Sequence, residues 1–206
     1  KISNNSAMKG GGIWVGDDCS PEFINCTISD NTAKWGAGMA CWGGSSVALT
    51  NCTFTDNSAT GSEGDGGGLH IYEASTASLD NCLFVNNGSQ RWGGGILCGD
   101  SSTLTLSDCA MTGNTAGADG GGIFIQVTSV LDASNCTFTG NNSGSNGGGI
   151  FMEEISNATI ENCMFTNNHA SKQGGGMSCS AQSTPNLDGC TFTGNSADID
   201  GGGIVC

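Results

Sequence analysis

Apolar and polar residues recur along this chain with a period of about 27 residues. Seven cysteines mark the repeat, with separations of 26, 30, 27, 27, 27 and 27 residues: Cys26, Cys52, Cys82, Cys109, Cys136, Cys163 and Cys190. A large apolar residue follows each of these anchor cysteines by two positions, and an asparagine follows by five. The asparagines are Asn31, Asn57, Asn87, Asn114, Asn141, Asn168 and Asn195. A fixed period of this length is typical of a solenoid, and the segment from Ile2 to Asn5 reads as one more copy.

Each repeat also contains a glycine triplet, once GAG, followed by an apolar residue. These apolar residues are Ile13, Met39, Leu69, Ile96, Ile123, Ile150, Met177 and Ile204. Because the residue two positions later is again apolar or cysteine, the pattern predicts a strand with one face turned inward. Another strand leads into the anchor cysteine, with apolar residues three positions before it. The triplet predicts a corner that excludes side chains, and the asparagine predicts a turn in which its amide bonds to backbone and to the next asparagine.

Such a unit cannot bury its own apolar side chains, so it needs an equivalent unit on each side. We therefore predict an all-β fold, a right-handed parallel β-helix of 7 to 8 rungs with about 27 residues per rung. It forms one continuous domain over residues 1–206. At roughly 4.8 Å per rung the stack is about 37 Å long. Since the chain starts and stops inside a repeat, we expect a segment of a longer array or copies that dock end to end.

The extra residues between Cys52 and the next triplet, around Gly61 to Asp65, predict a longer loop. Such a loop can protrude, and it is the first place to look for a specific contact. A tolerated insertion is the simpler explanation.

The coupled glycine and FxxN motifs resemble the repeats of the chlamydial polymorphic membrane proteins. They read GGGI at 10–13, FTDN at 54–57, GGGI at 147–150 and FTNN at 165–168. The resemblance covers the whole chain. It implies a surface-exposed autotransporter passenger that acts as an adhesin, and similar repeats occur in other large secreted or surface proteins of bacteria and protists.

The charge of the chain excludes several classes of partner. Five Lys and Arg face 19 Asp and Glu, which gives a net charge of −14 that repels nucleic acid and anionic lipid. No apolar run approaches the ~18 residues of a spanning helix, so we predict no direct membrane insertion. We expect an extracellular or cell-surface location. The expected partners are further copies or a continuation of the same chain, surface glycans, and host or cell-surface proteins.

Twelve cysteines in 206 residues indicate an oxidising compartment. The chain has no CxxC pair and only two histidines, so we predict neither a metal site nor a cofactor. Four disulfides are predicted within rungs: Cys19–Cys26, Cys41–Cys52, Cys98–Cys109 and Cys179–Cys190. Cys82, Cys136 and Cys163 would then remain buried thiols. A competing pattern joins anchor cysteines of adjacent rungs.

Seven Asn-x-Ser/Thr sequences are present, and two of their asparagines, Asn87 and Asn141, belong to the predicted turn ladder. These two are expected to be inaccessible. The candidate glycosylation sites are Asn4, Asn25, Asn51, Asn135 and Asn157.

Catalysis needs clustered carboxylates or a bound cation with a basic residue close by. The five basic residues lie on different turns, and Asp65, Asp119 and Asp200 before the triplets read as a solvated acidic edge, so we predict no catalytic residues. The favoured function is a structural or adhesive rod. The alternative is a carbohydrate-active enzyme or carbohydrate-binding module, and a minor one is ice binding through paired strand threonines.

The four tryptophans are the candidate contacts for a glycan or protein partner. They are Trp14, Trp35, Trp42 and Trp92. Their rings could stack on sugars or on another protein, and packing under loops is the competing interpretation.

Overall fold

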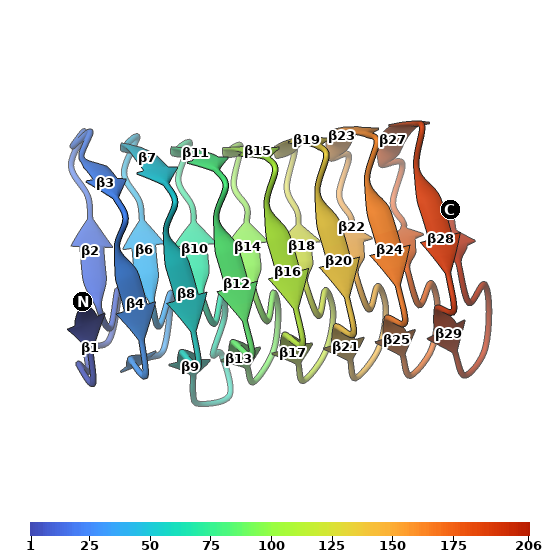
Figure 1. Cartoon of the computed structure of the whole chain (residues 1–206), viewed down its shortest axis with the longest axis horizontal. Helices are drawn as coiled ribbons and strands as arrows, with labels where there is room; N and C mark the ends of the chain where they lie inside the picture. Colours follow the sequence, from blue (N-terminus) through green and yellow to red (C-terminus); the bar gives the residue numbers. More distant parts are fainter.

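A computed structural model describes all residues 1–206 as thirty short strands without a helix. The strands form four parallel sheets that run side by side along the rod (Figure 1). No helix is present that could cross a bilayer. The chain passes through one strand of each sheet per rung, so the predicted all-β parallel β-helix with a repeat of about 27 residues is confirmed.

Each sheet is named here by its place in the repeat. The anchor sheet follows the anchor cysteines: β1 (Ile2–Ser3), β4 (Thr27–Ser29), β8 (Thr53–Thr55), β12 (Leu83–Val85), β16 (Ala110–Thr112), β20 (Thr137–Thr139), β24 (Met164–Thr166) and β28 (Thr191–Thr193). The glycine sheet follows the triplets: β2 (Ile13–Val15), β6 (Met39–Cys41), β10 (Leu69–Ile71), β14 (Ile96–Cys98), β18 (Ile123–Ile125), β22 (Ile150–Met152), β26 (Met177–Cys179) and β30 (Ile204–Val205).

Two further sheets complete each rung. The long-strand sheet precedes the anchor cysteines: β3 (Glu22–Ile24), β7 (Ser46–Thr50), β11 (Thr76–Asp80), β15 (Thr103–Ser107), β19 (Val130–Ser134), β23 (Asn157–Glu161) and β27 (Thr184–Asp188). The short-strand sheet follows the turn asparagines: β5 (Thr32–Ala33), β9 (Ser58–Ala59), β13 (Gly88–Ser89), β17 (Thr115–Ala116), β21 (Asn142–Ser143), β25 (His169–Ala170) and β29 (Ser196–Ala197).

The interior is one cluster of 34 buried residues that runs along the rod. Equivalent positions stack in register, so Phe84 pairs with Phe54 in the anchor sheet and their rings lie 4.6 Å apart. Ile96 pairs with Ile123 in the glycine sheet in the same way. The apolar positions expected from the repeat therefore form the core, because each rung covers the apolar face of the next.

The asparagine ladder is formed as predicted. Asn114, fully buried, donates from Nδ2 to the carbonyl of Phe84 at 2.9 Å and to Oδ1 of Asn141 at 3.0 Å. Its own Oδ1 accepts from the backbone nitrogen and Nδ2 of Asn87, at 3.0 and 3.1 Å. The same geometry repeats along the rod, so these buried amides are satisfied by backbone and by one another.

The glycine corners are explained by close backbone approach. In the triplet from Gly120 to Gly122, Gly120 has φ +69°, in the left-handed region. A Cβ on Gly121 would lie 2.5 Å from the carbonyl oxygens of Asn142 and Gly148, which belong to the next rung. A side chain cannot be accommodated at this second position without moving backbone.

The four predicted disulfides within rungs are not formed, and that prediction is corrected. Cys179 is bonded to Cys206 of the following rung, with 4.6 Å between their Cα atoms. Strands β26 and β30 are hydrogen-bonded neighbours, so equivalent residues of adjacent rungs lie closer than residues of different sheets in one rung. The other predicted partners are free thiols: Cys19, Cys26, Cys41, Cys52, Cys98, Cys109 and Cys190.

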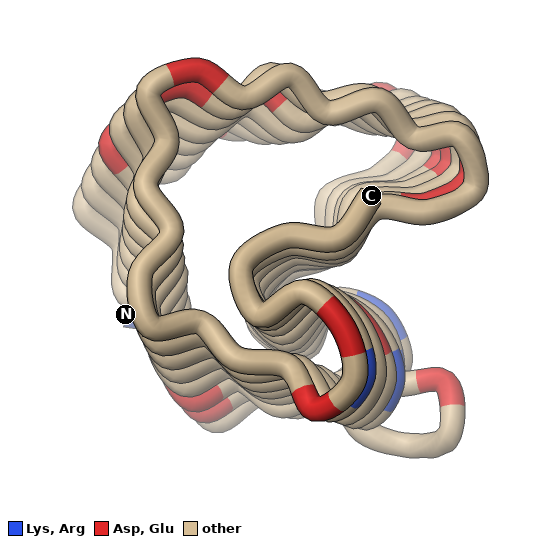
Figure 2. The backbone as a smooth tube through the Cα atoms, turned by 90° about the vertical axis from the view of Figure 1, so that its right-hand side faces the viewer, with Lys and Arg blue, Asp and Glu red and all other residues tan.

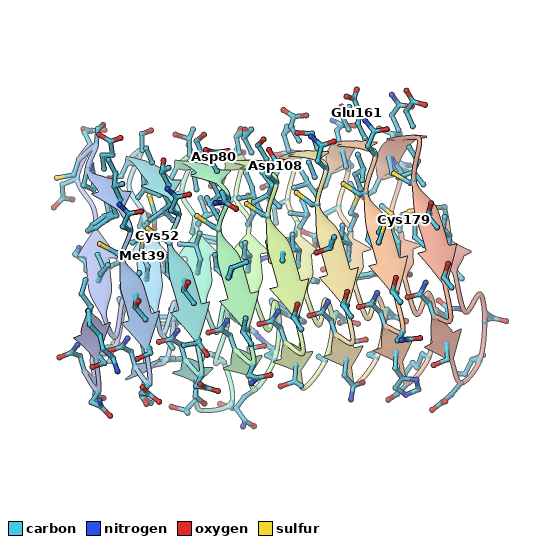
Figure 3. The ribbon with its side chains drawn as sticks, in the orientation of Figure 1. Met39, Cys52, Asp80, Asp108, Glu161 and Cys179 are labelled. Carbon is cyan, nitrogen blue, oxygen red and sulfur yellow. A yellow bond between two sulfur atoms is a disulfide. The ribbon has the colours of Figure 1, made fainter.

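Two of these thiols make their contacts with adjacent rungs. The sulfur of Cys41 lies 3.9 Å from the carbonyl oxygen of Thr76 in the next rung. The sulfur of Cys52 lies 3.4 Å from the carbonyl oxygen of Phe23 in the preceding rung. Cys82, Cys136 and Cys163 are buried free thiols, as expected. Figure 3 shows Cys52 and Cys179 among the side chains of the rod.

The glycine sheet is buried on both faces along its inner strands. Seen along the axis, the outline of the rod is indented, and the segment that leads to the C-terminus forms one wall of the indentation (Figure 2). The outward-facing central residues of its inner strands are covered too, since Leu97 and Phe124 are fully buried and Phe151 is 4% exposed. These three form a second apolar cluster outside the main core. The functional candidates lie beside this cluster.

Candidate functional site

The outward face of the glycine sheet carries aromatic residues over its first rungs. Trp14, Ala40, His70 and Leu97 occupy one register position in β2, β6, β10 and β14. Strand alternation turns them away from the main core. Trp35 lies in the ladder position before the triplet and bridges to Lys9 on one side and Asp65 on the other.

Six rings gather at this place, which we call the aromatic corner: Trp14, Trp35, Trp42, His70, Tyr72 and Trp92. Trp42 is central. Its ring centroid lies 5.8 Å from that of Trp14 and 5.9 Å from that of Trp35. It also lies 5.4 Å from His70, edge to face, and 5.3 Å from Tyr72. These are ordinary separations for attractive aromatic pairs.

Small residues make room for the rings. A Cβ on Gly99 would lie 2.9 Å from the Tyr72 ring and 3.0 Å from Gln126, so these two side chains lean over the glycine. Ala40, between Trp14 and His70 in register, is the smallest side chain of that ladder in the first four rungs. The corner therefore depends on the alternation of large and small side chains from rung to rung.

A pocket of about 300 Å³ opens among these rings. Its apolar and aromatic walls are Trp35, Trp42, His70, Tyr72 and Trp92, and its polar lining is Glu63, Asp65, Arg91 and Gln126. The loop predicted around Gly61 to Asp65 protrudes next to it below β9 (Figure 1), and Glu63 comes from that loop. A concave apolar surface with a few convergent polar groups is the usual form of a small-ligand site.

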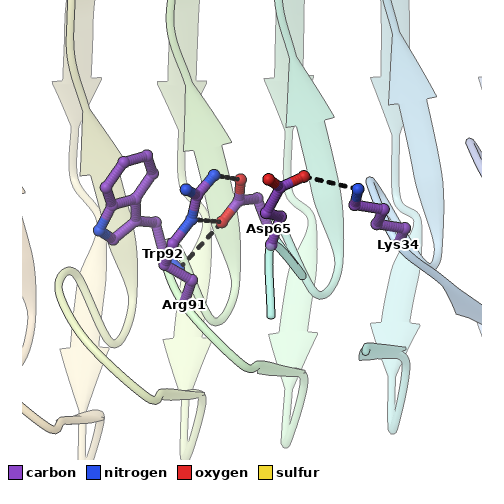
Figure 4. A network of polar contacts seen from close by, with 5 residues as sticks. Lys34, Asp65, Arg91 and Trp92 are labelled. Atoms are coloured by element: carbon purple, nitrogen blue, oxygen red, sulfur yellow. Dashed lines mark hydrogen bonds and ion pairs between the residues drawn. The ribbon is translucent and has the colours of Figure 1, made fainter. Parts of the chain in front are cut away.

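Two ion pairs fix the polar side of the pocket (Figure 4). Arg91 donates from Nε to Oδ1 of Asp65 at 3.0 Å and from Nη2 to Oδ2 at 2.5 Å. The backbone nitrogen of Trp92 donates to the same carboxylate at 3.3 Å. Lys34 pairs with the exposed Glu63 at 2.5 Å. Burial raises the pKa of Asp65 above its usual value even though Arg91 opposes the shift, and bonding to Lys34 lowers the pKa of Glu63.

Three of the five basic residues, although they belong to different turns, lie at this corner. Lys9 places its ammonium 3.5 Å from the Trp42 ring centroid, Lys34 lies 4.3 Å from that of Trp35, and Arg91 lies 3.7 Å from that of Trp92. Cation–π contacts of this kind attract the charged groups to the faces of the rings. Residues of different turns meet here because the turns stack at one corner of the rod (Figure 2).

The floor of the pocket contains buried polar atoms without a partner. Neither Nδ1 nor Nε2 of His70 has a hydrogen bond, and Nε1 of Trp42 has none. His70 is 3% exposed, and burial lowers its pKa to about 3, with the charges of Lys9 and Arg91 acting in the same direction. The imidazole is therefore neutral at physiological pH.

The predicted tryptophans come together only in part around one pocket. Trp35, Trp42 and Trp92 line it, whereas Trp14, 45% exposed, contacts Trp42 from the first rung. Glu63 and Asp65 come from the loop around Gly61 to Asp65, which was the first place to look for a specific contact, although Asp65 is buried and not part of a solvated acidic edge. Sequence reasoning missed the other lining residues: His70, Tyr72, Arg91 and Gln126. The signal for His70 was its place at the middle of a strand after the glycine triplet, where alternation turns the side chain outward.

The sequence model of a family described as a right-handed β-helix region matches residues 1–145 and 120–206. The chain belongs to this right-handed β-helix family. A search of curated proteins and a search of solved structures gave no match.

In this right-handed β-helix the candidate glycosylation sites lie on the surface. Asn25, Asn51 and Asn135 are exposed and have φ values of 54°, 52° and 54°, at the turn before each anchor cysteine. Asn4 and Asn157 are exposed as well. The ladder residues Asn87 and Asn141 are fully buried, as expected. Attachment of glycans at the five exposed sites stays a prediction.

The acidic residues of this β-helix do not assemble a cation site. No group of three His, Cys, Asp or Glu side chains has the geometry to hold a metal ion. In the ladder before the triplets, Asp119 bonds to Asn146 at 2.9 Å and Asp200 accepts from Gln173 at 2.9 Å. These carboxylates therefore serve contacts between adjacent rungs.

Proposed function

We propose that this β-helix is an adhesive segment of an extracellular or cell-surface rod and that it binds a carbohydrate at the aromatic corner. The observation that carries the proposal is the pocket of about 300 Å³ between Trp35, Trp42 and Trp92. Three half-buried indole rings line one hollow outside the 34-residue core, and Trp92 also stacks on Phe124 of the second apolar cluster.

The chemistry of the pocket fits a sugar. Flat rings offer apolar area to the C–H faces of a pyranose with little loss of side-chain entropy. Gln126, Glu63 and the half-exposed Tyr72 add polar groups at the edge, where hydroxyls of a stacked sugar would project. His70 lies in β10 and the other lining residues lie in the turns of stacked rungs, so the rod itself carries the pocket, which suits adhesion to a repeated surface polymer.

We also propose that the corner binds without catalysing a reaction. The two carboxylates that line the pocket are engaged in ion pairs, Asp65 with Arg91 and Glu63 with Lys34. Glycoside hydrolysis uses a pair of carboxyl groups held in different protonation states across the scissile bond. A carbohydrate-active enzyme is the second candidate, supported by the presence of both carboxylates at one pocket, since the β-helix fold by itself does not decide function.

The wider role follows from the repeat architecture and the charge. The resemblance to chlamydial polymorphic membrane proteins supports a surface adhesin, and a net charge of −14 disfavours nucleic acid as a partner. Glycans or glycoproteins of another surface, together with further copies or a continuation of the rod, are the proposed partners.

Binding can be tested by isothermal titration and tryptophan fluorescence with the linear hexasaccharides of glucose, galactose, mannose, xylose and N-acetylglucosamine. At least one is expected to bind and to change the fluorescence. Trp35→Ala is expected to weaken that binding about tenfold or more, because it removes one stacking face. The matched control is Leu83→Ala, which removes an exposed apolar side chain from the anchor sheet, far from the glycine sheet.

Two outcomes would contradict the proposal. One is the absence of binding to all five hexasaccharides by the wild-type chain. The other is equal binding by the wild type and Trp35→Ala. Release of new reducing ends from a bound hexasaccharide, abolished by Asp65→Asn, would instead establish the enzyme.

A further inference from the structure

His70 is a buried ionisable side chain that the rod does not need for its own hydrogen bonding. It lies at the centre of β10, whose backbone pairs with β6 on one side and β14 on the other. Both ring nitrogens lack a partner, and so does the indole nitrogen of the adjacent Trp42. Buried polar groups are nearly always bonded in folded proteins, so three unpaired ones at one pocket need an explanation.

The two rings that carry the three unpaired nitrogens are neighbours. The rings of Trp42 and His70 are 5.4 Å apart at an interplanar angle of 85°. Tyr72 lies 5.4 Å from His70 and 5.3 Å from Trp42, so its half-exposed ring forms the third side of the group. All three residues line the pocket. The unpaired atoms therefore belong to neighbouring rings that line the same cavity.

The protonation of this group restricts what can satisfy it. Burial holds the pKa of His70 at about 3, so the ring offers one N–H donor and one nitrogen acceptor. The indole of Trp42 offers a donor only. A hydroxyl can accept from one donor and donate to the free nitrogen at the same time. A carboxylate could only accept, and an ammonium group could only donate.

We propose that His70 and Trp42 form the specificity end of the pocket and hold one hydroxyl of the bound sugar between them. This inference rests on the proposed carbohydrate binding and names the group that is recognised. Because neither imidazole nitrogen is exposed to solvent, sugar entry moves the half-exposed rings of Trp42 and Tyr72 apart.

The test compares the wild type with His70→Phe, which keeps an aromatic ring and removes both nitrogens. The probes are the five hexasaccharides named above and a series of methyl pyranosides of the sugar that binds. Each member of this deoxy series lacks one hydroxyl. His70→Phe is expected to weaken hexasaccharide binding about 10- to 100-fold. One deoxy glycoside, the one that lacks the hydroxyl held by His70, should bind the wild type weakly. Its affinity for His70→Phe should be the same as its affinity for the wild type.

Nitrogen-15 spectra of the histidine ring give a second readout. Addition of the binding hexasaccharide is expected to shift the signal of the unprotonated His70 nitrogen, whereas the exposed His169 should not respond. Thermal denaturation checks that the variant is folded. Since His70→Phe removes an unpaired buried polar group, its melting temperature should equal or exceed that of the wild type.

The outcomes separate this inference from the proposed function. If His70→Phe binds within twofold of the wild type while Trp35→Ala does not bind, the pocket holds sugar without help from His70 and the inference is overturned. If no hexasaccharide binds the wild type, both proposals fall. A crystal structure in which one water bridges His70 and Trp42 both before and after sugar binding would also overturn it.

Discussion

His70 and Cys98 lie in neighbouring strands of the glycine sheet, on opposite faces. His70 pairs with Leu97 and faces the pocket, whereas Cys98 pairs with Ile71 and faces the core. Both side chains are buried, and burial penalises the charged form of an ionisable group. The pKa of His70 is therefore lowered to about 3 and that of Cys98 is raised to about 12, so both are neutral at pH 7.

The neutral imidazole makes the stability of the rod depend on pH. An unfolded histidine has a pKa of about 6.5, so below that pH the unfolded chain binds a proton that His70 in the folded chain does not bind. The contribution of neutral His70 to the free energy of unfolding is fully present above the unfolded pKa of about 6.5. It is lost as the pH falls toward the folded pKa of about 3. Urea denaturation of the wild type should show a loss of about 3 kcal/mol between pH 7 and pH 4 that His70→Phe does not share. Equal losses for both proteins would contradict the assignment.

Thiol reactivity tests the same physical cause on the inner face. Burial raises the pKa of Cys41 to about 11 and that of Cys98 to about 12. At pH 8 about one thiol in 10³ to 10⁴ would then be ionised, and the sulfurs are also shielded from reagent. Iodoacetamide followed by peptide mass spectrometry should label the exposed Cys19 in the native protein, and Cys41 and Cys98 only after denaturation. Labelling of Cys98 at the rate of Cys19 would show that the core is open.

At the scale of elements, the glycine corner and the asparagine turn set the path of each rung. The second glycine of a triplet lets a neighbouring rung pass within contact distance, and the asparagine bonds the turn to that rung. Both devices act between adjacent rungs. Neither one stabilises an isolated repeat, which is why the strands can be as short as two residues.

The corner predicts a strong effect of one methyl group. Gly121→Ala would place Cβ 2.5 Å from the carbonyl oxygens of Asn142 and Gly148, so backbone must shift in two rungs. We expect a loss of at least about 3 kcal/mol in unfolding free energy, or no folded protein. The matched control is Gly140→Asn. Its Cβ would meet nothing within 4 Å, and asparagine tolerates the left-handed φ of +63° at that turn. Similar melting temperatures for the two variants would contradict this account.

The elements could be predicted from the sequence because they repeat. The site could not be predicted, since it departs from the repeat. The triplet and the asparagine recur at the same position in every rung, so the repeat alone places Asn114 in a turn and Gly121 at a corner. The pocket instead depends on Gly99, which leaves room for Tyr72 and Gln126 in that one place. The disulfide of Cys179 was missed for a related reason, since sequence spacing does not show that axial neighbours are closer than residues across a rung.

At the scale of the whole molecule, stacking turns single charges into rows. Glu161 and Asp188 occupy one register position in adjacent long strands. Asp80 holds the same register position three rungs before Glu161, and this row runs along the outer edge of the rod, where Figure 3 labels both residues. Three of the five basic residues are grouped instead at the aromatic corner. Like charges that face each other across strands, such as Glu161 and Asp188, oppose folding.

Screening of these rows should stabilise the rod. The Debye length falls from about 30 Å at 10 mM salt to less than 10 Å at 500 mM, which suppresses repulsion between exposed carboxylates. We expect the melting temperature of the wild type to rise by several degrees over this range. Glu161→Lys should raise it already at 10 mM, because the lysine then faces Asp188, and should reduce the salt response.

The control for this charge reversal is Asn157→Lys, which adds the same side chain in the same strand but faces Val130 and Thr184 instead of a carboxylate. It also lowers the net negative charge, so a gain common to both lysine variants reports the overall charge of the molecule. A larger gain for Glu161→Lys reports the row itself. Salt could instead lower the melting temperature of the wild type. The ion pairs at the aromatic corner, Arg91 with Asp65 and Lys34 with Glu63, would then outweigh the repulsion between Glu161 and Asp188.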